Sequence, residues 1–228
     1  MIYSFYGLRR SGNHAILEWL LYNMGNGKDR FCHRKHYDSE KVISRGNSFY
    51  FNDVSRYSSH IQLCYDVIEA HQMGCNTMLV TYEDKPISYK LIPSKKDIVI
   101  IRDIVNVLAS RIKNSNPNNL SDMRVDQGIV DLWKEHASNQ DCIKILYESW
   151  LTSKSYRDSI CEHLNIFNLD NTNEVYSFGG GSSFVGERLD SKENLLNRYK
   201  DVDFPNEINE MISDKSIVEL RKKLGYIK

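Results

Sequence analysis

The chain has 228 residues, a length typical of one domain rather than two. Hydrophobic residues make up 41% and charged residues 26%, which excludes a wholly disordered chain, a collagen-like fibre and a coiled coil. The 30 basic and 30 acidic side chains cancel, so the bulk charge gives no reason to expect a nucleic-acid partner. We therefore predict a single domain over residues 1–228.

The elements expected in chain order alternate between strand and helix. They are a strand at 2–6, a loop at 7–12, a helix around 16–24, a strand at 49–54, a helix around 61–68, strands at 77–82 and 98–101, helices around 105–112 and 125–133, a strand at 143–147 and a helix around 156–164. Residues 98–101 are wholly apolar, which is typical of a strand buried on both faces. Alternating units of this kind predict an α/β fold, with a parallel sheet between two layers of helices.

Cysteine usage and hydropathy bear on the cellular compartment. The cysteines are odd in number and far apart, and none forms a CxxC pair, which favours a reducing compartment and offers no zinc site. The sequence has neither a secretory signal pattern nor an 18-residue apolar stretch. We therefore expect a cytoplasmic protein with no membrane span and no metal. The oligomeric state is not predicted.

The sharpest motif is FYGLRRSGNHAILEWL, at residues 5–20. It places a strand, a turn that opens at Gly7 and a helix N-terminus in succession. The unpaired N–H groups of a first helical turn, together with the helix dipole, favour a bound anion. Arg9 and Arg10 add guanidinium groups that match tetrahedral oxyanions. This pattern predicts an anion cradle; a solvated arginine pair beside an ordinary Ser-Gly turn is the alternative.

The spacing from Gly7 to Gly12 resembles a Walker A loop, GxxxxGK[ST]. Asn13 and His14, however, stand where that loop has its lysine and its serine or threonine. Those residues serve the β- and γ-phosphates and Mg²⁺. Their loss disfavours a metal-dependent ATPase or kinase and favours a nucleotide-like anion that is handled without a divalent metal.

A second motif is DIVIIRDIVNVLASR, at residues 97–111. Arg102 follows a buried strand, where ligands bind in α/β sheets. Asp103 is a natural N-cap for the next helix, and Ser110 lies two turns along it. The alternative is that Arg102 pairs with a nearby carboxylate and that Ser110 is an incidental hydroxyl on the helix.

Together the two motifs resemble the sulfotransferase family that uses 3′-phosphoadenosine 5′-phosphosulfate (PAPS). In that family a PKSGTT segment cradles the 5′-phosphosulfate, and RRSGNH stands in its place here. The resemblance implies binding through the matched residues Arg10, Ser11, Gly12, Asn13 and His14. Arg9, the other arginine of the pair, is a further candidate for binding. The family's second motif binds the 3′-phosphate and is matched by Arg102 and Ser110. LYESW at 146–150 is similar to the family's YEDL segment. A P-loop-like three-layer fold is implied.

The family's C-terminal RKGxxGDW motif is absent. GGGSSFVGER, from Gly179 to Arg188, is a loose counterpart in which Ser182 and Ser183 would donate to phosphate. A surface turn is the alternative for this glycine-rich segment.

The resemblance also implies a general base near the phosphosulfate. Glu83, at the end of a predicted strand, is the first candidate, and His14, His33 and His36 are the others. Glu83 could instead cap a loop or pair with an arginine of the first motif, and the His33–His36 stretch could be a solvated basic face. Arg10 and His14 suit the charge that develops on the leaving phosphate.

We therefore expect a PAPS-dependent sulfotransferase whose acceptor is a hydroxyl or amine of a carbohydrate or small molecule. One alternative is a P-loop kinase with a degenerate Walker A loop. The other is a non-catalytic nucleotide- or anion-binding module.

Overall fold

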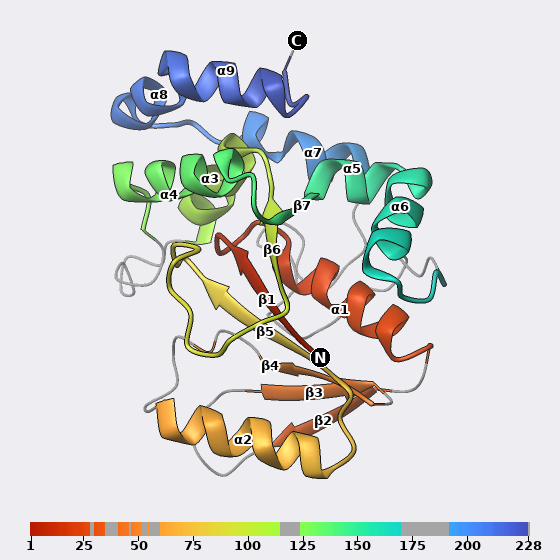
Figure 1. Ribbon diagram of the computed structural model, residues 1–228. Coiled ribbons are helices and arrows are strands. Elements are labelled where there is room, and N and C mark those ends of the chain that lie inside the picture. The colour runs from red at the N-terminus through yellow and green to blue at the C-terminus, as the bar shows by residue number, and fades with distance from the viewer. Residues whose placement is uncertain are drawn as a thin grey trace.

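The computed structural model describes residues 1–27, 30–34, 41–45, 47–51, 54, 60–114, 124–169 and 192–227. Within them the chain forms a seven-stranded sheet in the order β2-β3-β4-β5-β1-β6-β7 (Figure 1). The strands are β1 (Ile2–Gly7), β2 (Arg30–Arg34), β3 (Lys41–Arg45), β4 (Ser48–Phe51), β5 (Thr77–Glu83), β6 (Lys96–Ile101) and β7 (Ile143–Leu146).

Strands β4, β5, β1, β6 and β7 are all parallel, which confirms the predicted parallel sheet. Two antiparallel strands extend it beyond β4, because β3 pairs with β4 and β2 pairs with β3. The sequence pattern predicts no strand at residues 30–45. Both strands are only five residues long and rich in basic residues, so they lack the apolar run by which a strand is recognised in sequence.

Helices cover both faces of the sheet (Figure 1). They are α1 (Asn13–Met24), α2 (His60–Gln72), α3 (Ile104–Asn114), α4 (Gln127–Ser138), α5 (Tyr147–Thr152), α6 (Lys154–Leu164), α7 (Lys192–Asn197), the 3₁₀ helix η2 (Arg198–Asp201), α8 (Asn206–Ser213) and α9 (Lys215–Lys223). One core cluster joins one face of the sheet to α1, α5 and α6. The other joins the opposite face to α2, α3, α4, α8 and α9. The fold is therefore a three-layer α/β arrangement.

Strand β6 shows why the sheet is central. Ile98 and Ile100 belong to the cluster with α1, whereas Val99 and Ile101 belong to the cluster with α3 and α4. All four are buried, as the apolar run predicted. Within the described ranges, no helix combines the length and apolarity needed to cross a bilayer.

Strand order places a switch point between β1 and β6. The chain leaves β1 toward the β4 side of the sheet, whereas it leaves β6 for β7 on the other side. In open α/β sheets, ligands bind outside the carboxyl ends of the strands at such a point. The loop between β1 and α1 and the residues that follow β6 both lie there.

Candidate anion site at the carboxyl edge of the sheet

The loop between β1 and α1 has the backbone geometry of an anion cradle. Arg10 and Gly12 adopt positive φ angles of 74° and 87°, and Ser11 between them does not. Alternating right- and left-handed residues turn successive N–H groups toward one side and form anion-binding nests. Helix α1 begins directly after Gly12, so the N–H groups of its first turn join the same edge.

Three side chains fix this loop by its carbonyl groups. The carbonyl oxygens of residues 8–10 accept, in order, from Asn13 Nδ2 at 3.2 Å, Arg111 Nε at 3.2 Å and Arg102 NH1 at 3.1 Å. The Asn13 side chain also accepts from the Ser11 hydroxyl at 2.5 Å. The side-chain amide of Asn13 is thus engaged within the loop. The group that Asn13 would offer to a ligand is its backbone N–H.

Gly12 is required by packing as well as by its backbone angle. A Cβ atom at this position would lie closer than 3.0 Å to the ring of Tyr147, the first residue of α5. The Arg102 guanidinium lies over the same ring, with its central carbon 4.8 Å from the centre of the Tyr147 ring. Tyr147 thus connects the loop to Arg102, although the sequence analysis had placed it at the end of a strand.

Arg102 joins the two predicted motifs. Its side chain is buried, and besides the loop carbonyl it donates to the Leu195 carbonyl of α7 at 2.9 Å. Its Nε has no hydrogen-bond partner among the described residues, and the same is true of Arg10 Nε. Buried polar atoms in native proteins are usually hydrogen-bonded, so these two Nε–H groups are donors that water, an ion or a ligand could use.

Helix α3 carries the second half of the predicted 3′-phosphate motif. Ser110 is buried, one turn beyond Asn106 on the same face of the helix. Asn106 Nδ2 donates to the Leu196 carbonyl at 3.0 Å, and its Oδ1 has no partner in the described part of the chain. In this structure α7 therefore lies against both Arg102 and Asn106 through backbone carbonyls.

Two acidic residues at the end of β5 face the loop. Glu83 accepts from Asn13 Nδ2 at 3.1 Å, and its other oxygen lies 3.5 Å from Arg9 Nε. Asp84 accepts from the Arg9 backbone N–H at 2.9 Å and pairs with the fully buried guanidinium of Arg111. The structure thus places Glu83 in the ion pair that the sequence analysis had kept as an alternative to a base.

Glu148, the second residue of α5, is an acid that the sequence analysis left without a role. Its Oε1 accepts from the Asp103 N–H at 3.1 Å and lies 4.0 Å from Arg102 Nε. Burial raises the pKa of Glu148 to about 7, and Arg102 only partly offsets that rise. Its Oε2 has no hydrogen-bond partner among the described residues.

The C-terminal helix closes this side of the site. Arg221 of α9 forms a bidentate pair with Asp103, with both N···O distances at 2.8 Å. The Tyr226 hydroxyl donates to the Ile101 carbonyl at 3.2 Å. Burial raises the pKa of Tyr226 well above its usual value, and the charge of Glu148 adds to the effect.

The structure brings together most of the predicted site residues. Those at the carboxyl edge of β1, β5 and β6 are Arg9, Arg10, Ser11, Gly12, Asn13, His14, Glu83 and Arg102. His33 lies in β2, which β3, β4 and β5 separate from β1. Strands are about 4.8 Å apart, so the β2 backbone is about 19 Å from that of β1. His36, Ser182 and Ser183 lie outside the described residues.

Several residues at this edge were not identified from sequence: Asp84, Asn106, Arg111, Glu148 and Arg221. Four of them lie close to positions that the sequence does single out. Glu148 directly follows the predicted strand at 143–147 and Asp84 lies two residues after the one at 77–82, while Asn106 and Arg111 lie on the helix that carries Ser110.

A scan against protein-family models, a search of curated proteins and a search of solved structures each find no match for this chain. Among the described residues, no group of three or more His, Cys, Asp or Glu side chains is placed to hold a metal ion.

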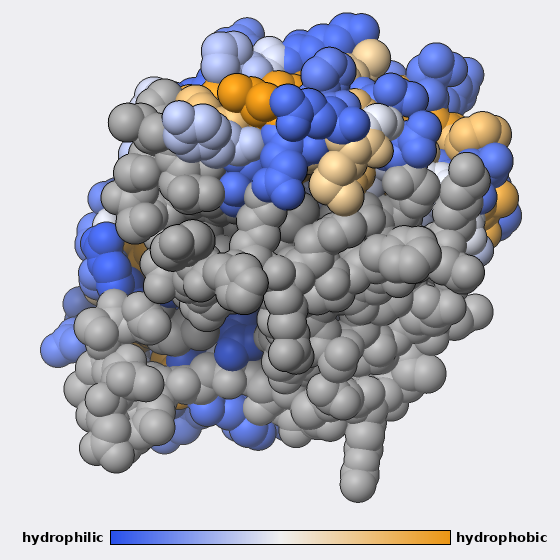
Figure 2. Space-filling model, turned by 90° about the horizontal axis from the view of Figure 1, so that it is seen from below, coloured by the Kyte–Doolittle hydropathy of each residue, from blue (hydrophilic) through white to orange (hydrophobic). Residues whose placement is uncertain are grey.

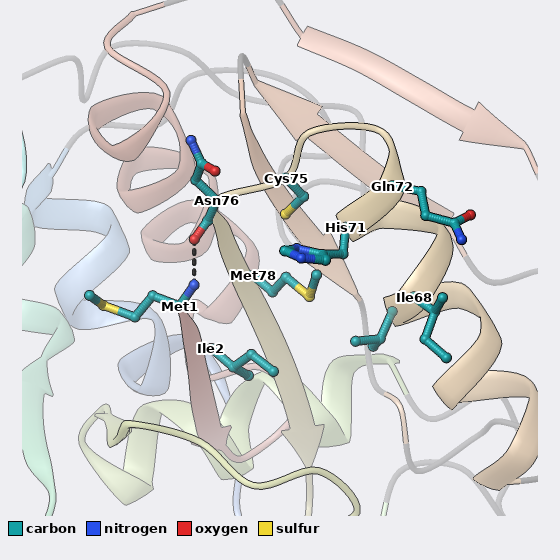
Figure 3. A pocket seen from close by; sticks show the side chains of 9 residues that line it. Met1, Ile2, Ile68, His71, Gln72, Cys75, Asn76 and Met78 are labelled. Atoms are coloured by element: carbon teal, nitrogen blue, oxygen red, sulfur yellow. Dashed lines mark hydrogen bonds between the residues drawn. The ribbon is translucent and has the colours of Figure 1, made fainter.

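A separate hollow of about 600 Å³ lies at the opposite edge of the sheet, where β1 and β5 begin beside α2. Figure 3 shows Ile68 and His71 reaching toward it from α2, with Met78 at its floor. No residue predicted for the anion site lines it. On the described part of the face seen in Figure 2, hydrophobic atoms lie scattered among hydrophilic ones.

Proposed function

We propose that the protein transfers a sulfuryl group from PAPS to a hydroxyl or amine of an acceptor, on a P-loop-like α/β fold. The observation that carries the proposal is the 3.1 Å hydrogen bond from Arg102 NH1 to the Arg10 carbonyl. It joins two motifs that are 92 residues apart and that stand in the order that the resemblance implies. Both lie at the switch point of the sheet, the usual ligand position in such folds.

The residues fit an anionic nucleotide. The N–H groups of Arg9 and Ser11 already donate to Asp84 and to the Leu8 carbonyl. The 5′-phosphosulfate would therefore bind the N–H groups of residues 10 and 12 and of the first turn of α1, with the side chains of Arg9, Arg10 and His14 around it. The unpartnered Nε atoms of Arg10 and Arg102 supply donors that no described protein group satisfies. A 3′-phosphate at Arg102 and Ser110 would replace the Leu195 carbonyl that now accepts from Arg102.

The reaction forms a bond from the acceptor oxygen or nitrogen to sulfur and breaks the bond from sulfur to the bridging phosphate oxygen. The chain would hold donor and acceptor in line and place positive charge where the leaving phosphate becomes more negative. Arg10 and the α1 N-terminus suit that task. Glu83 would take the acceptor proton, and the ion pair with Arg9 would hold its carboxylate toward the loop.

Calorimetric titration with 3′-phosphoadenosine 5′-phosphate, beside ATP with Mg²⁺, tests the proposal. We expect micromolar binding of the first without metal and at least a tenfold loss of affinity in Arg10→Ala and Arg102→Ala. Arg124→Ala is a matched control, because that side chain is 62% exposed and forms its ion pair with Asp126, away from the loop between β1 and α1. Preference for Mg-ATP would refute the proposal in favour of a kinase.

Transfer itself needs a separate measurement. Release of 3′-phosphoadenosine 5′-phosphate from PAPS should accelerate with an acceptor drawn from panels of sugars, phenols and amines, and Glu83→Gln should slow it while nucleotide affinity is retained. If the nucleotide binds but Glu83→Gln and His14→Asn both leave turnover unchanged at background rate, the protein is a binding module rather than an enzyme.

A further inference from the structure

The end of β6 holds a group of four charged side chains beside the anion site. Arg102 and Asp103 follow the strand, Glu148 comes from α5 and Arg221 from α9. Asp103 is already satisfied by its bidentate pair with Arg221. Glu148 is therefore the acid whose charge can balance that of Arg102. Arg102 itself donates to the Arg10 carbonyl in the loop between β1 and α1.

The Arg102–Glu148 contact is close but loose. Arg102 Nε and Glu148 Oε1 are 4.0 Å apart, beyond hydrogen-bond distance, and Oε1 is already used by the Asp103 N–H. Both Arg102 Nε and Glu148 Oε2 are buried without a hydrogen-bond partner in the described part of the chain. Arg102 Nε can therefore donate to a second negatively charged group.

We propose that Glu148 is a positioning residue of the anion site, which restrains Arg102 when ionised and frees its charge for a bound anion when protonated. This inference rests on the proposed function, because it assigns Arg102 to the same anion. With Glu148 ionised, the two cations and two acids of the group cancel. With Glu148 protonated by solvent, the group carries one net positive charge at the edge of the site.

The neutral form of Glu148 is accessible near physiological pH, since burial raises its pKa to about 7. The other groups that face it are Arg102, Asp103 and the Tyr226 hydroxyl, and burial raises the pKa of Tyr226 well above its usual value. An anion near Glu148 disfavours the ionised carboxylate. Anion binding must therefore take up protons, and affinity must fall as pH rises through about 7.

Inorganic sulfate is the probe, because it remains a dianion from pH 6 to pH 8.5 whereas nucleotide phosphates titrate. Calorimetry at constant ionic strength, in two buffers of different ionisation enthalpy, gives both affinity and proton uptake. We expect the wild-type dissociation constant to rise about fivefold from pH 6 to pH 8, the rise that coupling of about one pKa unit gives when the pKa of Glu148 without the anion is about 7. Proton uptake should be largest at about pH 7.5, midway between the two pKa values.

Glu148→Gln keeps the oxygen that accepts from Asp103 but cannot ionise. It should bind sulfate as the wild type does at pH 6, with no proton uptake and little change in affinity up to pH 8. The matched control is Glu135→Gln, a glutamate on α4 that also accepts from a backbone N–H, that of Ile87 at 2.9 Å. This control should retain the wild-type pH dependence.

His14 also lies at this loop, and its replacement separates its contribution from that of Glu148. A pH dependence that survives in Glu148→Gln but disappears in His14→Asn would overturn the inference, as would absence of proton uptake by the wild type. In either case sulfate still binds, so the proposed function stands. If neither sulfate nor 3′-phosphoadenosine 5′-phosphate binds at any pH, the proposed function fails and the inference fails with it.

Discussion

Replacing Gly12 by alanine tests how closely the loop between β1 and α1 is packed. The substitution has two separate costs. A left-handed φ costs an L-residue about 1 kcal/mol, and Gly12 has φ 87°. The new Cβ would also lie closer than 3.0 Å to the Tyr147 ring, and overpacking of this kind costs about 2 kcal/mol more. The sum is about 3 kcal/mol.

The same substitution at Gly74 measures the cost of the backbone angle alone. Its φ is 85°, almost that of Gly12, but a Cβ there meets nothing within 4 Å. Gly74→Ala should therefore lower the free energy of unfolding by only about 1 kcal/mol. For a chain of this length, 1 kcal/mol corresponds to about 3 °C in Tm, so the expected shifts are about 3 °C for Gly74→Ala and about 9 °C for Gly12→Ala.

Thermal unfolding of both variants, followed by circular dichroism, measures these shifts. In a double-mutant cycle with Tyr147→Ala, the extra cost of Gly12→Ala should vanish, because the ring that it meets is gone. Equal Tm shifts for the two glycine variants would refute the reasoning. So would a Gly12→Ala cost that is independent of Tyr147.

Two further predictions concern buried charge. Arg111→Met removes the guanidinium that pairs with Asp84 and donates to the Arg9 carbonyl of the loop. It should lower the free energy of unfolding by about 3 kcal/mol, measured as a lower urea midpoint with an unchanged slope. A change below about 1 kcal/mol would contradict this role. Because the folded pKa of Glu148 is raised from 4.5 to about 7, the folded protein binds this proton more tightly, so its contribution to stability is present below pH 4.5 and is lost as pH rises to 7. Glu148→Gln should therefore gain stability relative to the wild type between pH 5 and pH 8, and parallel pH profiles would rule that out.

The core of the fold was within reach of sequence reasoning. Apolar runs such as residues 98–101 specify buried strands, and their alternation with helices specifies a parallel sheet. The position of Arg10 and Arg102 after neighbouring strands follows from the same rule, since the carboxyl ends of parallel strands meet at one edge. That β1 and β6 lie side by side, which brings Arg102 into contact with the Arg10 carbonyl, is known only from the strand order in the structure.

Other features depend on tertiary contacts that no local pattern reveals. The antiparallel strands β2 and β3 are held by backbone pairing, so their side chains need not be apolar. Arg111 looks like an ordinary basic residue in the last turn of α3, and only the fold shows that it is fully buried against Asp84. The altered acidity of Glu148 depends on burial and on Arg102.

The central place of β1 has a consequence for how the chain folds during synthesis. Ile2 pairs with Met78 and Tyr3 pairs with Lys96, so both neighbours of this strand are made long after it. Until β5 and β6 leave the ribosome, a strand that will be buried on both faces has no partner. Contacts of such long sequence separation slow folding and leave unpaired edges exposed. The same topology that brings two distant motifs together therefore makes the loop between β1 and α1 one of the last regions to be completed.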